Sequence, residues 1–286
     1  METQSIFKRY EASGIVPAIN VSIILLLGLC IMFFLGFLYS ALTTIITIVY
    51  FNVFVLIGFS FVIAHISHFM NVTFKMRNKI ASMIVTAILA LLATYFQWVF
   101  YLYLISYENI TPLNDISFII NDLILDPKYL IDYIIELNKV GVWEIGSVTY
   151  TGTTLWLIWL AEFILTLVIS LRIYDKFKLK PFSEKDNNWF NKTRIITDFE
   201  YIDLKRTFLD RFYKNPANAL SSLEKGNGIK QSNIYIFSNK SQNSFLISIE
   251  NSIVNNKGRK EYSTVLEPCY LNRNHLIEIK EKFTIT

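Results

Sequence analysis

The sequence has very few residues that could crosslink the chain or hold a metal ion. Of its 286 residues, two are cysteines, Cys30 and Cys269, and three are histidines. A disulfide framework needs several closely spaced cysteines, and a structural zinc site needs about four Cys or His ligands. We therefore expect a chain without disulfides, without a resident metal and without a cofactor.

Charged residues are also scarce, and apolar residues take their place. Charged residues make up 17% of the chain, whereas 53% of it is hydrophobic and 15% is aromatic. A soluble domain of ordinary composition has about 25% charged residues. This balance excludes an ordinary soluble globular protein and indicates a membrane protein whose first partner is the lipid bilayer.

Four apolar runs are long enough to cross a bilayer, which takes about 20 residues of helix. They cover residues 18–40, 43–66, 80–105 and 153–171. The first run exceeds the h-region of a signal peptide, about 7 to 15 residues, and a second run follows it at once. We therefore expect four spanning helices, with the first one retained.

Positive charge is sorted along the chain. Lys and Arg gather before the first span at 8–9, between the second and third spans at 75–79, and after the fourth span at 172–180. The long connection at 106–152 is acidic instead. Because cationic loops stay in the cytoplasm, the sequence predicts a multi-pass membrane protein with both termini cytoplasmic.

These patterns predict a membrane all-α four-helix bundle followed by a small cytosolic α+β domain. The predicted parts are a cytosolic N-terminal segment at 1–17, the bundle at 18–174, an extracytoplasmic amphipathic insertion at about 106–152, a basic juxtamembrane segment at 175–180 and the cytosolic domain at 181–286. In the insertion, Asp126 and Pro127 favour the start of a helix and Gly141 its end. That helix would lie on the outer leaflet or cap the bundle.

The cytosolic domain changes its hydrophobic period halfway along. "DFEYIDLKRTFLDRFYKN" repeats apolar residues at helical spacing, and a second helix is expected from Asn215 to Gly226. "NIYIF", "SFLISIENSIV" and "KEYSTVL" alternate in twos and predict strands, with a turn at "NNKG". A final helix is expected at "RNHLIEIKEKF".

Three polar side chains are predicted at one depth inside the membrane. Counted at about 1.5 Å per residue from the outer ends of their spans, Glu162, Asn52 and Gln97 all lie about 12 to 14 Å deep. A lone ionised carboxylate there costs at least about 2.5 kcal/mol, so we expect Glu162 to face the bundle interior and its amide neighbours. Two interpretations remain open: a proton or ion pathway, and a hydrogen-bonded clasp between helices.

His65 and His68 form the other candidate site, at the inner end of the second span. Their spacing of three residues puts them on one helix face. Two such histidines could bind a metal only with a third ligand, and the sequence has no HExxH motif. We interpret them as interfacial residues and assign no metal; a membrane-embedded enzyme built on them is a minor alternative.

The sequence therefore favours a non-enzymatic function. It contains no GxSxG motif and no Gly-rich phosphate loop. We expect an inner-membrane anchor or scaffold whose cytosolic domain docks a protein partner or senses a ligand, acting as a homo-oligomer or an oligomeric effector. The alternative is a small-solute or proton pathway that uses Glu162. Nucleic acid is not an expected partner, because the basic residues of the domain are interspersed with acidic ones.

Two stretches resemble an uncharacterised group of four-span bacterial inner-membrane proteins. They are "VGVWEIG" with "TGTTLWLIWLAEF", and "KPFSEKDNNWF" after the last span. That group carries Pro-Phe-Cys-x-x-Cys-x-x-Trp after the last span and another Cys-x-x-Cys in the cytosolic domain, similar to a zinc ribbon. Here these positions hold Ser183, Asp186, Ser238 and Ser241. The resemblance implies a multi-pass protein of the bacterial inner membrane, and it implies no known activity. Because serine supplies no thiolate, the resemblance also implies a degenerate zinc ribbon without zinc.

Overall fold

The chain forms two compact units, which we describe separately. One contains Met1–Ser13 together with Lys180–Thr286, and the other contains Gly14–Leu179. The structure is a computed structural model and describes residues 7–46, 48–106, 117–145, 148–195 and 198–283.

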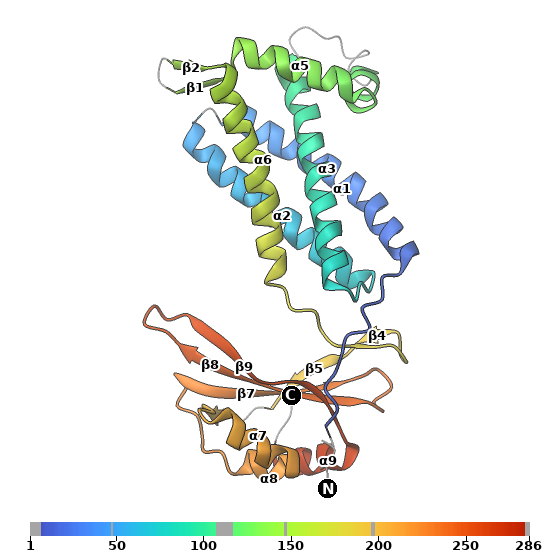
Figure 1. Ribbon diagram of the computed structural model, residues 1–286, viewed down its shortest axis with the longest axis vertical. Helices are drawn as coiled ribbons and strands as arrows, with labels where there is room; N and C mark the ends of the chain where they lie inside the picture. Colours follow the sequence, from blue (N-terminus) through green and yellow to red (C-terminus); the bar gives the residue numbers. More distant parts are fainter. Residues whose placement is uncertain (1–6, 47, 107–116, 146–147, 196–197, 284–286) are drawn as a thin grey trace. The chain divides into compact units, whose positions relative to one another are not determined.

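The unit formed by Gly14–Leu179 is built on four long helices that run side by side (Figure 1). They are α1 (Ala18–Ile45), α2 (Val49–Thr73), α3 (Lys79–Ser106) and α6 (Gly152–Asp175). Each is long and apolar enough to cross a membrane, and many of their large apolar side chains are exposed on the outside of the bundle. By length and composition these are the helices of a multi-pass membrane protein.

Helices α1 and α3 approach each other unusually closely at a glycine. A Cβ atom added at Gly36 would lie 2.8 Å from the backbone nitrogen of Gln97 and 2.8 Å from the carbonyl carbon of Phe96. One turn further on, the hydroxyl of Ser40 donates to the carbonyl of Gln97 at 2.6 Å. Small residues bring backbones together in this way where no hydrophobic effect drives helices together.

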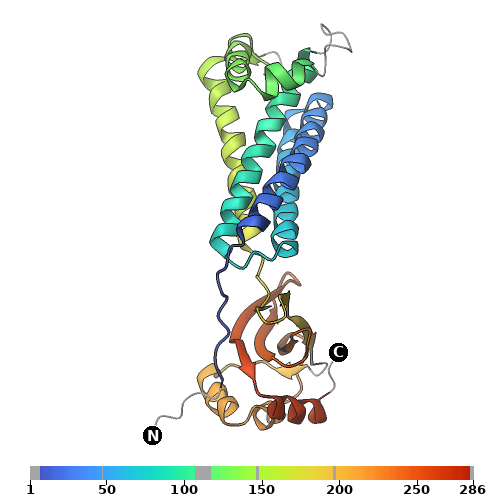
Figure 2. The same ribbon diagram turned by 90° about the vertical axis from the view of Figure 1, so that its right-hand side faces the viewer.

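The connection between α3 and α6 caps one end of the bundle. Helix α5 (Pro127–Val140) begins as predicted, because the Asp126 carboxylate accepts from the backbone N–H groups of Lys128 and Tyr129 at 3.1 Å each. It lies across the ends of the long helices (Figure 2) and buries Leu130 and Ile134 in one cluster with residues of α3 and α6. Of the two arrangements predicted for this helix, the structure has the cap.

Shorter elements complete the cap. They are η2 (Phe118–Ile124) and a hairpin of β1 (Trp143–Ile145) and β2 (Val148–Tyr150). The hydroxyl of Tyr95 on α3 donates to the carbonyl of Ile124 at 2.8 Å, which fixes η2 to the bundle. Of the acidic residues predicted on the outer side, Glu108 and Asp115 lie outside the described residues.

The other unit is an antiparallel sheet with helices on one face (Figure 1). Its strand order is β5-β7-β8-β9, formed by β5 (Asn191–Arg194), β7 (Lys230–Ser238), β8 (Phe245–Val254) and β9 (Lys260–Leu271), and β6 (Phe199–Glu200) also pairs with β7. Helices α7 (Lys205–Lys214), α8 (Pro216–Ser221) and α9 (Arg273–Lys282) cover that face, and β3 (Phe182–Ser183) and β4 (Asn188–Trp189) form a separate hairpin. The α+β class predicted for this part of the chain is confirmed.

The first predicted helix of this domain starts later than its apolar spacing indicated. Phe199 pairs with Ser232 as part of β6, and helix α7 begins only at Lys205. The side-chain amide of Asn251 donates to the carbonyl of Ile202 at 3.0 Å and so holds the intervening segment against β8. The second helix begins after Asn215, whose side chain accepts from the N–H of Asn218, as predicted.

The N-terminal segment is part of this domain. Phe7 is only 5% exposed and lies in the same core as the helices α7 and α9. The carbonyl of Lys8 accepts from the N–H of Tyr270, and the N–H of Tyr10 donates to the carbonyl of Pro268, both at 2.8 Å. Residues 8–10, within the segment predicted at 1–17, thus extend the sheet along the edge of β9.

Candidate functional site

Gln97 and Glu162 line one small cavity inside the bundle. Its volume is about 10 Å³, and Tyr39, Thr94 and Thr166 are also among its lining residues. A cavity needs roughly 10 to 15 Å³ of such space to hold one water molecule. The interior therefore has room for about one water between these polar groups, far less than a hydrated channel needs.

The geometry of this pair differs from a directly bonded clasp. Within the described chain, no hydrogen bond joins the Glu162 carboxyl to the Gln97 amide, although both groups face the same cavity. Direct bonds between spanning helices contribute on average about 0.6 kcal/mol. A single bridging water would satisfy both groups and keep the carboxyl from standing alone in an apolar surrounding.

Asn52 does not share this level. The structure starts α2 at Val49, so Asn52 is only three residues from its end, whereas Phe59 of the same helix lines the cavity. The predicted depth assumed a span starting near Thr43. Instead α1 continues to Ile45, because Thr43 and Thr44 donate their hydroxyls to carbonyls of the preceding turn and stay helical.

Tyr39 is a polar residue of this layer that the sequence analysis missed. Tyr39 is 7% exposed. The centroid of its ring lies 4.4 Å from that of Phe59, and both residues line the cavity. Its neighbours Gly36 and Ser40 make the close contact with α3 described above. The spacing of Gly28, Gly36 and Ser40 at multiples of four was the available signal, since small residues at that spacing mark helix contacts in membranes.

A second group of buried polar residues lies at the opposite end of the bundle. It consists of Ser67 and Asn71 on α2, Ser82 on α3 and Tyr174 on α6, each at most 2% exposed. The Tyr174 hydroxyl lies beside the side chains of Ser82 and Asn71. These residues come from three helices, and only the packing of those helices reveals that they are buried together.

His65 and His68 meet at one aromatic ring. The ring of His68 stacks on Phe177 at 4.1 Å, and the ring of His65 lies edge-on to it at 5.0 Å. Nδ1 of His65 is 2.8 Å from the carbonyl of Phe61. Among the described residues no group of three or more His, Cys, Asp or Glu side chains is placed to hold a metal ion. The arrangement is an aromatic cluster that ties the segment after α6 to α2.

The positions that the resemblance assigned to zinc ligands lie in two turns that contact each other. The Asp186 carboxylate accepts from the N–H of Ser241 at 3.0 Å and from its hydroxyl at 2.8 Å. Within the first turn, the N–H of Asp186 donates to the hydroxyl of Ser183 at 3.3 Å. Asn187 and Gln242, which follow Asp186 and Ser241, have left-handed backbones with φ of 46° and 52°. A carboxylate–serine contact thus joins the two turns.

This contact predicts a pH dependence of the domain. The backbone and hydroxyl bonds from Ser241 hold the pKa of Asp186 below its ordinary value. Because the folded pKa is lowered, its stabilising effect is full above the unfolded pKa of about 3.9 and is lost as pH falls through the folded value. We therefore compare the unfolding temperature of the domain at about pH 6, above the unfolded pKa, with that at about pH 3, below it. We expect this temperature to fall less in Asp186→Asn than in the native chain.

Melting profiles of the full chain against pH would check this. Glu267→Gln, which removes one exposed negative charge elsewhere in the domain, is the control and should keep the native profile. Parallel profiles for the native chain and Asp186→Asn would contradict the assignment.

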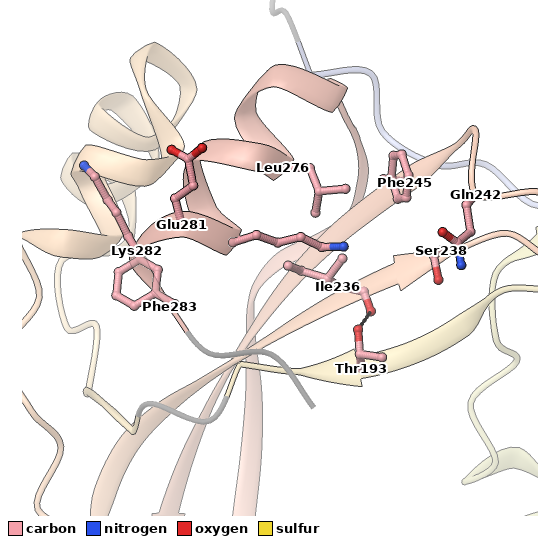
Figure 3. A pocket seen from close by; sticks show the side chains of 10 residues that line it. Thr193, Ile236, Ser238, Gln242, Phe245, Leu276, Glu281, Lys282 and Phe283 are labelled. Carbon is pink, nitrogen blue, oxygen red and sulfur yellow. Dashed lines mark hydrogen bonds between the residues drawn. The ribbon is translucent and has the colours of Figure 1, made fainter.

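The domain also contains an open groove between α9 and the strands β5 and β7. Its volume is about 580 Å³. Thr193, Ser238 and Gln242 lie toward one end of it, and Glu281, Lys282 and Phe283 lie toward the other (Figure 3). Binding sites for small molecules commonly have about 300 to 1,000 Å³. Its residues come from both halves of the domain, so no local sequence pattern marks it.

Comparisons of the chain with protein-family models, with curated proteins and with solved structures give no match.

Proposed function

We propose that this protein is a non-enzymatic anchor of the bacterial inner membrane whose α+β domain, on the cytoplasmic side, senses a ligand or docks a protein partner. The chain acts as a homo-oligomer in this proposal. The observation that carries it is a contrast between two described sites: the cavity that Gln97 and Glu162 line has about 10 Å³, whereas the groove beside α9 has about 580 Å³.

The position of the N-terminal segment supports the proposed topology. Phe7 and Tyr10, just ahead of α1, pack in the same domain as the chain that follows α6. This packing favours an arrangement in which both ends of the four-helix region lie on one side of the membrane, as an even number of spans gives. The Lys and Arg residues at 8–9, 75–79 and 172–180 support the proposal that this side is the cytoplasm.

Site-directed labelling tests this topology. Glu136→Cys on α5 and Lys257→Cys in the β8–β9 turn are expected to react with a membrane-impermeant thiol reagent from opposite sides, the first from outside. The unsubstituted chain, with Cys269 buried and Cys30 in a spanning helix, is the control for background. Labelling of both positions from one side would contradict the four-span arrangement.

A proton pathway through the bundle is the second candidate, favoured by the shared cavity of Gln97 and Glu162. Ionisable residues within spanning helices commonly belong to such relays. The two functions differ in what they predict for flux and for the loss of the titratable group.

Reconstituted vesicles separate them. With a pH-sensitive dye inside and an imposed potential, the anchor predicts a proton flux equal to that of empty vesicles for both the native chain and Glu162→Gln. A pathway predicts a flux that Glu162→Gln abolishes while the protein still inserts, because the transferable proton is gone. A Glu162-dependent flux would overturn the anchor proposal.

A further inference from the structure

We propose that the groove beside α9 binds a small molecule with an apolar body and one oxyanion, either a carboxylate or a phosphate. This deepens the proposed sensing function and names the chemical class of its ligand. The inference rests on three donor groups and an apolar wall that share the groove.

The donors are the ammonium of Lys280, the hydroxyl of Ser238 and the side-chain amide of Gln242. All three residues line the groove, and within the described chain none of these three groups has a hydrogen-bond or ion-pair partner. The hydroxyl of Thr193 is different, because it already donates to the carbonyl of Ile236 at 3.0 Å. A carboxylate or phosphate oxygen is the acceptor that a lysine ammonium binds most strongly.

The two lysines of the groove are not equivalent. Lys282 donates to the side-chain oxygen of Asn218 at 2.9 Å, whereas Lys280, two residues earlier on α9, is uncommitted. The carboxylate of Glu281 lies at the end of the groove away from Ser238 and Gln242 (Figure 3). Glu281, the acidic residue among the described lining residues, therefore lies away from two of the three donors.

The wall supplies the apolar part of the site. Ile236, Phe245 and Leu276 are at most 8% exposed and line the groove. Gln242 has a left-handed backbone, φ 52°, which is uncommon for a residue other than glycine. Such conformations concentrate at ligand sites, and this one places a side-chain amide at the groove.

Calorimetric titration of the full chain in lipid nanodiscs tests the site, with phenyl phosphate as the probe. Inorganic phosphate and phenol are the half-probes. We expect saturable binding of phenyl phosphate that is at least about tenfold tighter than binding of either half-probe. We expect Lys280→Gln to weaken it about tenfold or more, since the oxyanion loses its charged donor. Benzoate in place of phenyl phosphate distinguishes carboxylate from phosphate ligands.

Lys282→Gln is the matched control, with the same change two residues along the same helix. It should alter the affinity by less than about threefold, because its ammonium is bound to Asn218. An equal loss of affinity in Lys280→Gln and Lys282→Gln would mean that binding depends only on the general positive charge of the helix, and this would contradict the proposed site. So would the absence of saturable binding, or phosphate binding as tightly as phenyl phosphate. Flux and labelling decide the anchor function separately, so the groove and the proposed function fail in distinguishable ways.

Discussion

Phe7→Ala is expected to destabilise the α+β domain by about 3 to 5 kcal/mol, the usual cost of removing a buried phenylalanine. Its ring lies 5.7 Å from the ring of Phe212 and 5.8 Å from those of Tyr213 and His275, so it occupies the core between α7 and α9. The truncation leaves a cavity that these rings cannot fill without moving. The effect should appear far from Phe7 in the sequence, around Phe212 and His275.

Hydrogen exchange in the full chain measures this effect. A loss of 3 to 5 kcal/mol accelerates exchange of the slowest amides in β8 and β9 by about 100- to 4,000-fold, at about 1.4 kcal/mol per factor of ten. Tyr262→Ala, which truncates an aromatic side chain that is 56% exposed, is the control and should change stability by less than about 1 kcal/mol. Unchanged protection in Phe7→Ala would show that the N-terminal segment does not belong to the domain.

Residues 181–286 alone do not make up the whole folded domain. The core of the domain includes Phe7, and its sheet continues through Lys8 to Tyr10. A fragment lacking the N-terminal segment would expose the edge of β9 at Pro268 to Tyr270 and leave part of the core open. Exposed strand edges of this kind favour aggregation.

Features governed by local chemistry were predictable from the sequence. The four long helices follow from apolar length, and α5 follows from the cap at Asp126, the proline at its first position and Gly141 at its end. The strands β7, β8 and β9 follow from alternation and from the turn at 255–258. In each case the deciding interactions lie within a few residues of one another.

Features that depend on packing were not predictable in the same way. The depth predicted for Asn52 assumed that the first helix ends before Thr43. Thr43 and Thr44 can end a helix or continue it, and here their hydroxyls donate to the carbonyls of Tyr39 and Ser40 within a continuing helix. Tyr39 lines the polar cavity because α1 packs closely on α3, and this contact could not be predicted from the sequence around Tyr39. The groove, likewise, brings Ser238 of the sheet to a helix that starts 35 residues later at Arg273.

Helices α1 and α3 are in close contact at Gly36. Gly36→Ala should destabilise the bundle by about 1 to 3 kcal/mol and Gly36→Leu by more, because the added Cβ meets the backbone of Phe96 and Gln97 at 2.8 Å. Backbone atoms in the middle of a helix cannot rotate aside, so the two helices must separate. That separation would also break the hydrogen bond of Ser40 to Gln97 and shift one wall of the polar cavity.

The chain offers two matched substitutions that isolate this effect from helix propensity. At Gly58, in α2, an added Cβ meets nothing within 4 Å, so Gly58→Ala should be neutral or slightly stabilising, as alanine favours helix by about 1 kcal/mol. At Gly28 the nearest atom is the side-chain Cδ2 of Leu89, at 2.3 Å, which can move by a rotamer change, so Gly28→Ala should fall between the other two. Thermal unfolding of the three alanine variants in detergent should rank them Gly58, Gly28, Gly36 from most to least stable. If Gly36→Ala unfolds at the same temperature as Gly58→Ala, α1 does not pack on α3 at this glycine, and the polar layer loses the contact that positions Gln97 opposite Glu162.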